Sequence, residues 1–168
     1  KADAVAGLEL LRSRFSSVGV IGHSEGGTIA MMLAAEKQVD FVVSLAGMIV
    51  SGAETLVHQN RIALTDAGLP EETVEEYCGL ISDAFDACIN NRPMPTADGR
   101  NLPESLKQNY MAVLMQMRTP YLSNFLAVDV RPLLGDIICP VLALNGTKDI
   151  QVDQETNLAA LRNGLGDN

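Results

Sequence analysis

The glycine-rich segment Gly22–Gly27 constrains the fold more strongly than any other part of the chain. Its sequence, GHSEGG, follows the short apolar run Ser17–Ile21 and precedes the run Thr28–Lys37, which is rich in Ala, Met and Leu. A short β-branched apolar run is typical of a buried strand in a parallel sheet, whereas Ala, Met and Leu favour helix. The sequence therefore predicts a strand, a tight turn and a helix in direct succession.

The rest of the chain supplies further elements of the same kind. Buried strands are predicted over Asp40–Ala46 and Ile137–Leu144, and a last helix over Asp153–Asn163. A first helix is predicted over Ala2–Phe15. Its apolar face would consist of Val5, Leu8, Leu11 and Phe15. Strands that alternate with helices are the pattern of an α/β protein, so we predict three parallel strands flanked by helices.

The middle of the chain, residues 52–124, has apolar side chains that recur every three or four residues and no run typical of a strand. Helices are predicted over Ala53–Ala67, from Pro70 onward and around Leu106–Met117, with a polar loop over Asn90–Pro103. We interpret this block as a helical cap inserted into the sheet domain. The expected organisation is a sheet core over residues 1–51, the cap over 52–130 and a return to the core over 131–168.

The pattern Gly22-x-Ser24-x-Gly26 fits the nucleophile elbow, in which a serine occupies a sharp turn between strand and helix. Residues two before and two after the serine come so close that side chains there would clash, which glycine avoids. The turn presents the Ser24 hydroxyl at the carboxyl ends of the strands, where the following helix favours negative charge. Ser24 is the candidate nucleophile, and the backbone N–H of Glu25 is a candidate oxyanion donor.

A serine nucleophile needs a general base and an acid that orients the base, in the chain order Ser, acid, His. Asp149 stands just past the third predicted strand and is the candidate acid. Asp153 is its rival, but it lies where a helix N-cap is expected. Asp129 and Asp136 precede that strand and are expected to be caps or solvated loop residues.

The general base is not evident in this sequence. The two histidines, His23 and His58, both precede Asp149. We expect His23 to pack beside the elbow with its side chain turned away from Ser24, and His58 to lie in a cap helix. The triad is therefore incomplete in this chain, which we expect to be inactive by itself.

Composition and charge narrow the range of partners. The net charge of −9 argues against a nucleic acid or an anionic membrane as a partner, because both bind basic surfaces. The absence of Trp argues against a surface on which bases stack. No apolar run approaches the roughly 18 residues of a membrane span. Cys78, Cys88 and Cys139 are expected to be small buried residues rather than disulfides or metal ligands. We expect a small-molecule substrate and no cofactor or metal.

The stretches VIGHSEGG and CPVLALNGTKDIQV and the helical insertion between them resemble the α/β-hydrolase carboxylesterases, notably bacterial acyl-ester hydrolases of the EstD type. The resemblance implies a partial α/β-hydrolase fold, with Ser24 as nucleophile, Glu25 N–H in the oxyanion hole and Asp149 as triad acid. It places the histidine in a loop beyond Asn168 and the first oxyanion donor before Lys1. It also implies that the strand before Ser24 normally pairs with an upstream strand, so its edge would favour self-association here.

Three alternatives stay open at the level of sequence. A peptidase or an acyltransferase can use the same elbow, and a non-catalytic binding domain can keep the same fold.

Several apolar cap residues could line an acyl pocket, although ordinary helical core is the favoured interpretation. These residues are Met111, Leu114, Met115, Met117 and Phe125.

Overall fold

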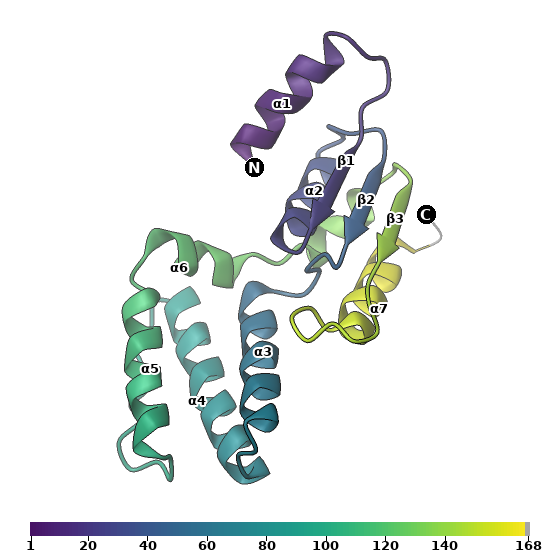
Figure 1. Cartoon of the computed structure of the whole chain (residues 1–168). Helices are drawn as coiled ribbons and strands as arrows, with labels where there is room; N and C mark the ends of the chain where they lie inside the picture. The colour runs from purple at the N-terminus through teal and green to yellow at the C-terminus, as the bar shows by residue number, and fades with distance from the viewer. Residues whose placement is uncertain (167–168) are drawn as a thin grey trace. The chain divides into compact units, whose positions relative to one another are not determined.

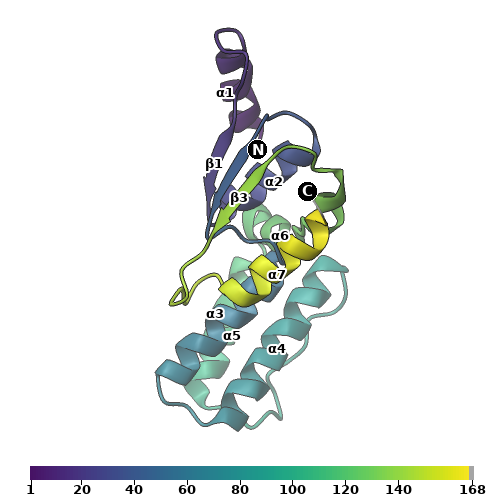
Figure 2. The ribbon, with the colours of Figure 1, turned by 90° about the vertical axis from the view of Figure 1, so that its right-hand side faces the viewer.

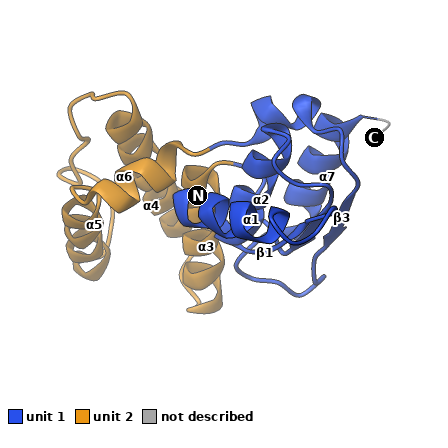
Figure 3. Cartoon of the chain, turned by 90° about the horizontal axis from the view of Figure 1, so that it is seen from above, with its two compact units in different colours: residues 1–50, 129–168 blue, residues 51–128 orange. Residues whose placement is uncertain are grey.

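The computed structural model describes residues 1–166 and divides them into two compact units (Figure 1; Figure 3). Unit 1 comprises residues 1–50 and the segment from Asp129 onward, and unit 2 comprises Ser51–Val128. In unit 1 the elements are α1 (Ala2–Arg12), β1 (Val20–His23), α2 (Glu25–Ala35), β2 (Val42–Leu45), the 3-10 helix η1 (Arg131–Asp136), β3 (Val141–Leu144) and α7 (Gln154–Leu165). In unit 2 they are α3 (Gly52–Asp66), α4 (Glu71–Ile89), α5 (Glu104–Gln116) and α6 (Pro120–Ala127).

Unit 1 contains a three-stranded parallel sheet in the order β1-β2-β3, which confirms the predicted α/β fold. Helices α2 and α7 lie on the same side of these strands (Figure 2). The core on that side includes fully buried Met31 and Leu33 of α2, together with Val42 of β2 and Leu134 of η1. Burial of these apolar side chains supplies the main driving force for folding of the unit.

The other face of the sheet is open, which corrects the prediction of strands buried on both sides. Side chains alternate between the faces of a strand. The register places Ile21 beside Val43 and Leu142 in one row, and His23 beside Leu45 and Leu144 in the next. Ile21, Leu142 and Leu144 are 68%, 54% and 52% exposed. These six residues form the open face of the sheet.

Helix α1 also differs from the prediction. It ends at Arg12, and of the four expected apolar residues only Leu8 is buried. Leu11 and Phe15 are 43% and 58% exposed. Periodicity correctly indicated a helix, but it could not tell which apolar positions have a neighbouring element to pack against.

Unit 2 consists of helices joined by loops, the longest of which lies between Ile89 and Glu104 as predicted, and no strand interrupts residues 51–128. Its capping follows local sequence rules: Ser51 and Glu54 form a capping box at the start of α3, and the Thr119 hydroxyl accepts a hydrogen bond from the Leu122 N–H at the start of α6. Helix α6 was not predicted from the sequence. The placement of this unit as a cap over the strands stays a prediction.

The interior of unit 2 is formed by α4 with its neighbours. Its buried residues are Tyr77, Leu80, Ile81, Ala84, Phe85, Leu102, Leu106, Tyr110, Met117 and Leu126. Of the residues proposed for an acyl pocket or cap core, Met111 and Met115 are 58% and 70% exposed. Both are therefore surface residues of this unit, and the helical core draws on Met117 instead.

The three cysteines are free, as expected from the sequence. Cys78 is buried as predicted, whereas Cys88 and Cys139, which were also predicted to be buried, are half-buried. Burial raises the pKa of the Cys78 and Cys139 thiols, so these groups stay protonated at neutral pH.

Candidate functional site

Ser24 forms the junction between β1 and α2. Strand β1 runs through His23 and helix α2 begins at Glu25, so the chain reverses at this single residue. Both elements reach further into the glycine segment than predicted, because the strand pairs with β2 up to His23 and the first helical turn accommodates Gly26 and Gly27. Ser24 has φ 53° and ψ −120°, a region that non-glycine residues rarely occupy.

Three backbone hydrogen bonds hold Ser24 in this conformation. Its N–H donates to the carbonyl of Leu45 at 3.1 Å, and its carbonyl accepts from Gly27 N–H at 2.9 Å and from Met48 N–H at 3.3 Å. The buried Thr28 hydroxyl in turn donates to the Met48 carbonyl at 2.7 Å. The surrounding structure therefore fixes a backbone angle that the residue alone would not adopt.

The glycines around Ser24 have unequal roles. A Cβ at Gly22 would lie 2.1 Å from the carbonyl oxygen of Gly26, so glycine is required there as predicted. The clash predicted at Gly26 is absent, because a Cβ at that position meets no atom within 4 Å. The second close approach occurs instead at Gly27, where a Cβ would lie 2.4 Å from the Cα of Gly47. The motif identified the tight turn but not this contact between α2 and the segment after β2.

Glu25 is the first residue of α2, as the oxyanion assignment requires. The helix spans 11 residues, and its N-terminus lies next to the carboxyl end of β1. The N–H groups of a first helical turn point toward that end, and together with the helix dipole they make it favourable for negative charge.

Asp149 lies in the loop that follows β3 and is half-buried. Its Oδ1 accepts hydrogen bonds from the backbone N–H groups of Gln151 and Val152 at 2.9 and 3.0 Å. The same loop is closed by Asn145, whose Nδ2 donates to the Val152 carbonyl at 2.9 Å. One carboxylate oxygen of Asp149 is therefore engaged within its own loop, and Oδ2 is the atom that could orient a partner.

Ser24 and Asp149 follow strands that are second neighbours in the sheet. Strand β2 lies between β1 and β3, and parallel strands are about 4.8 Å apart, so the two strand ends are separated by about 10 Å. No hydrogen bond joins Ser24 to Asp149 within residues 1–166. A group about the size of an imidazole would be needed to connect them.

The competing aspartates have other roles. Asp153 is the N-cap of α7 and its Oδ2 accepts from Thr156 N–H at 2.7 Å, which confirms the predicted cap. Asp129 accepts hydrogen bonds from the backbone and side chain of Arg131. Burial alone would raise the pKa of Asp129, but these bonds and the Arg131 charge lower it overall. Asp136 is exposed at the end of η1.

Neither histidine contacts Ser24 through a hydrogen bond in the described part of the chain. His23 is exposed on the open face, so its predicted packing beside the elbow is wrong. The reason is the alternation of β1, which directs His23 to the same side as exposed Ile21. His58 lies on α3 of unit 2 and is half-buried.

Sequence reasoning missed the segment that follows β2. Ala46 has a φ of 46°, and its N–H donates to the Leu144 carbonyl at 2.7 Å. Asn157 of α7 accepts hydrogen bonds from the N–H groups of Ile49 and Val50 at 2.7 and 3.2 Å. One sequence feature could have identified Asn157. It lies four positions before the apolar, buried Leu161, so the two residues share one face of the helix, and a polar residue there needs a partner.

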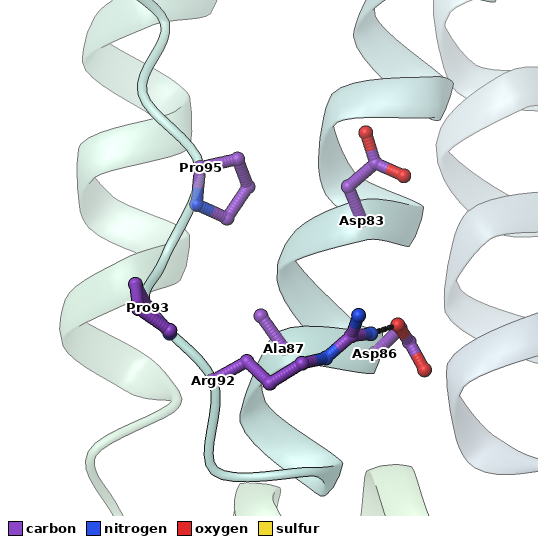
Figure 4. Close-up of a pocket in the computed structure, with 6 residues that line it drawn as sticks. All are labelled: Asp83, Asp86, Ala87, Arg92, Pro93 and Pro95. Carbon is purple, nitrogen blue, oxygen red and sulfur yellow. Dashed lines mark ion pairs between the residues drawn. The ribbon is translucent and has the colours of Figure 1, made fainter.

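A shallow recess of about 310 Å³ lies within unit 2 (Figure 4). It is lined by Asp83, Asp86, Ala87, Arg92, Pro93 and Pro95, and Arg92 forms an ion pair with Asp86. It contains none of the predicted site residues.

Within residues 1–166 there is also no group of three His, Cys, Asp or Glu side chains placed to hold a metal ion. No helix in that range is long and apolar enough to cross a membrane.

Two solved structures resemble this chain at low sequence identity. One is a hydrolase from Pseudomonas aeruginosa PA01, at 20% identity and a TM-score of 0.49, with 97% of this chain and 58% of that chain covered. The other is BpoC of Mycobacterium tuberculosis H37Rv, described as a candidate non-heme bromoperoxidase, at 19% identity and a TM-score of 0.49, with 98% and 60% covered. The chain thus spans about three fifths of the length of these structures.

A comparison with curated protein sequences gives no significant match. A family model described as BAAT / Acyl-CoA thioester hydrolase C terminal matches residues 9–119, which include β1, Ser24, α2 and most of unit 2. This match extends over more than half of the chain, and the chain therefore belongs to the BAAT / acyl-CoA thioester hydrolase C-terminal family.

Proposed function

We propose that Ser24 is the nucleophile of a cofactor-independent serine hydrolase that cleaves acyl esters or thioesters. The observation that carries this proposal is the backbone of Ser24, held at φ 53° between a strand and a helix N-terminus by bonds to Leu45, Gly27 and Met48. A non-glycine residue kept in such a conformation is a recognised mark of a functional position. Membership of a family named for thioester hydrolysis supports the same reaction class.

The proposed reaction proceeds through an acyl enzyme. The Ser24 Oγ attacks the carbonyl carbon and transfers its proton to a histidine, while the N–H of Glu25 and the α2 N-terminus stabilise the oxyanion. The tetrahedral intermediate expels the alcohol or thiol, which receives the proton, and water then releases the acid from Ser24. Asp149 Oδ2 would orient the histidine, which must bridge the separation of about 10 Å between the β1 and β3 strand ends.

The family description favours a thioester over an ordinary carboxylic ester as substrate. The elbow by itself is compatible with both, because each reaction passes through the same tetrahedral oxyanion. The finer resemblance to carboxylesterases of the EstD type, drawn from the two sequence stretches, supports an oxygen ester instead. Rates on p-nitrophenyl acetate and on a short acyl-CoA, the latter followed by thiol release, separate the two substrate classes.

A fluorophosphonate probe tests the nucleophile directly. In the protein that carries this chain, peptide mass spectrometry should place the label on Ser24, and Ser24→Ala should abolish both labelling and turnover. Ser17→Ala is the matched control, since Ser17 is exposed and lies before the same strand. Labelling of another serine with turnover retained in Ser24→Ala would exclude the proposal.

A further inference from the structure

The segment that joins β2 to α3 is buried without belonging to a helix or strand. Met48, Ile49 and Val50 are 5%, 1% and 7% exposed. Buried backbone N–H groups need acceptors, because an unpaired one costs about as much as a lost hydrogen bond. The acceptors of this segment therefore identify what holds it in place.

One side chain serves two of these N–H groups. Asn157 Oδ1 accepts from Ile49 at 2.7 Å and from Val50 at 3.2 Å, and the Asn157 side chain is itself buried at 3% exposure. Its Nδ2 donates to the Asp153 carbonyl at 2.8 Å. These contacts fix the amide orientation, since a flipped amide would set its NH₂ group against two donors.

The same short segment is bonded to the nucleophile elbow at its other end. Met48 N–H donates to the Ser24 carbonyl at 3.3 Å, and the Met48 carbonyl accepts from the Thr28 hydroxyl at 2.7 Å. Helix α7, which carries Asn157, starts directly after the Asp149 loop, with Asp153 as its N-cap. Asn157 and Ser24 are therefore connected through this segment, by hydrogen bonds at Ile49 and Val50 on one side, the peptide bond to Met48, and the Met48 hydrogen bond on the other.

We propose that Asn157 is a positioning residue of the nucleophile elbow, acting on Ser24 through the segment Met48–Val50. The inference rests on the proposed function, in which Ser24 attacks the substrate. Catalysis requires the nucleophile to be held in productive geometry, and small displacements cause large losses of rate. Without the Asn157 amide, the Ile49 and Val50 N–H groups lose their acceptor, the segment shifts and Met48 no longer holds the Ser24 carbonyl.

The first test measures hydrogen exchange of individual amides by NMR in the 168-residue chain. Asn157→Leu should accelerate exchange at Met48, Ile49 and Val50 by at least about tenfold relative to Leu161→Ala. Leu161 is the matched control, because it is 4% exposed on the same helix and forms none of these hydrogen bonds. Asn157→Asp should exchange more slowly than Asn157→Leu, since a carboxylate still accepts both N–H groups, although it has no N–H for the Asp153 carbonyl. Equal exchange at Met48 in Asn157→Leu and Leu161→Ala would overturn the proposal.

The second test measures the reactivity of Ser24 in the protein that carries this chain, at a temperature where every variant is folded. Asn157→Leu should lower kcat and the fluorophosphonate labelling rate about tenfold with KM unchanged, and Asn157→Asp, which keeps the acceptor for both N–H groups, should lose less of both rates than Asn157→Leu. Leu161→Ala should react at the parent rate; an equal loss there would make Asn157 a stability residue only and overturn the proposal. Activity that survives Ser24→Ala would instead refute the proposed function, and the exchange result at Met48 is unaffected by that outcome.

Discussion

The backbone carbonyl of Ser24 accepts a hydrogen bond from the backbone N–H of Met48, 24 positions further along the chain. This bond joins the elbow to the segment that leaves β2 for the helical unit. It also gives the unusual φ of Ser24 a cause, since the residue is held from β2 and from this segment at once.

Replacement of Ser24 by glycine should stabilise the fold while removing the nucleophile. Glycine occupies positive φ without strain, so Ser24→Gly should raise the free energy of unfolding by about 1 kcal/mol. Ser24→Ala keeps the strain and should leave stability close to that of the parent. Urea denaturation measures the free energy of unfolding of both variants. A Ser24→Gly variant less stable than Ser24→Ala would show that the backbone of Ser24 is not strained.

The two adjacent glycines of the elbow should respond oppositely to alanine. Gly27→Ala places a methyl group against the backbone of Gly47 and should cost about 1–3 kcal/mol of stability or more. Gly26→Ala meets open space in the first turn of α2 and should be neutral or stabilising by up to about 1 kcal/mol. Thermal unfolding of Gly26→Ala and Gly27→Ala checks this difference in stability. Equal destabilisation of the two variants would contradict the close approach of Gly27 to Gly47.

Asp149 should matter for turnover much more than Asp153. In Asp149→Asn the amide oxygen can still accept from Gln151 and Val152, so the loop persists while the negative charge is lost. We expect kcat to fall by about 10⁴, as for other triads. Asp153→Asn should leave kcat unchanged because asparagine also caps helices well. The opposite result would assign the acid to Asp153.

The open face and the edge of β1 should cause the isolated chain to self-associate. Parallel sheets are normally covered on both faces, and Ile21 is 68% exposed on an edge strand. The sedimentation coefficient of the parent should increase with protein concentration as the chain associates. That of Ile21→Lys should stay closer to the value of a monomer. Leu10→Lys, at a 60% exposed apolar position on α1, is the control and should behave as the parent. Identical sedimentation of the Ile21→Lys variant and the parent would exclude this surface.

Alkaline pH should destabilise the helical unit through Tyr77. Burial raises the pKa of this phenol from 10.0 to about 12, although the Asn109 amide donates to its oxygen at 2.7 Å. The unfolded chain then loses the proton at lower pH than the folded one. The stabilising contribution is therefore complete below pH 10 and is lost as pH rises through about 12. Tyr77→Phe should flatten the fall in unfolding free energy over this range, and an unchanged slope would refute the assignment.

Much of this architecture follows from local sequence. Apolar runs and helical periodicity predicted three strands and the helical middle block, because each depends on residues close together in the chain. The same holds for the Gly22 turn and for Asp153 as an N-cap, since a cap satisfies N–H groups only three positions away.

Tertiary structure decided the features that depend on distant neighbours. His23 and Ile21 are exposed because unit 1 leaves that face of β1 uncovered, which the neighbouring apolar sequence could not reveal. Gly27 requires glycine only because Gly47 of another segment approaches it, and Gly26 does not require it. Asn157 and Met48 act on residues far away in sequence, through hydrogen bonds that form only after the chain has folded. Local sequence patterns indicate whether a segment forms a strand or a helix. Close contacts such as that between Gly27 and Gly47, and buried hydrogen bonds such as those of Asn157, depend on which distant segments pack together.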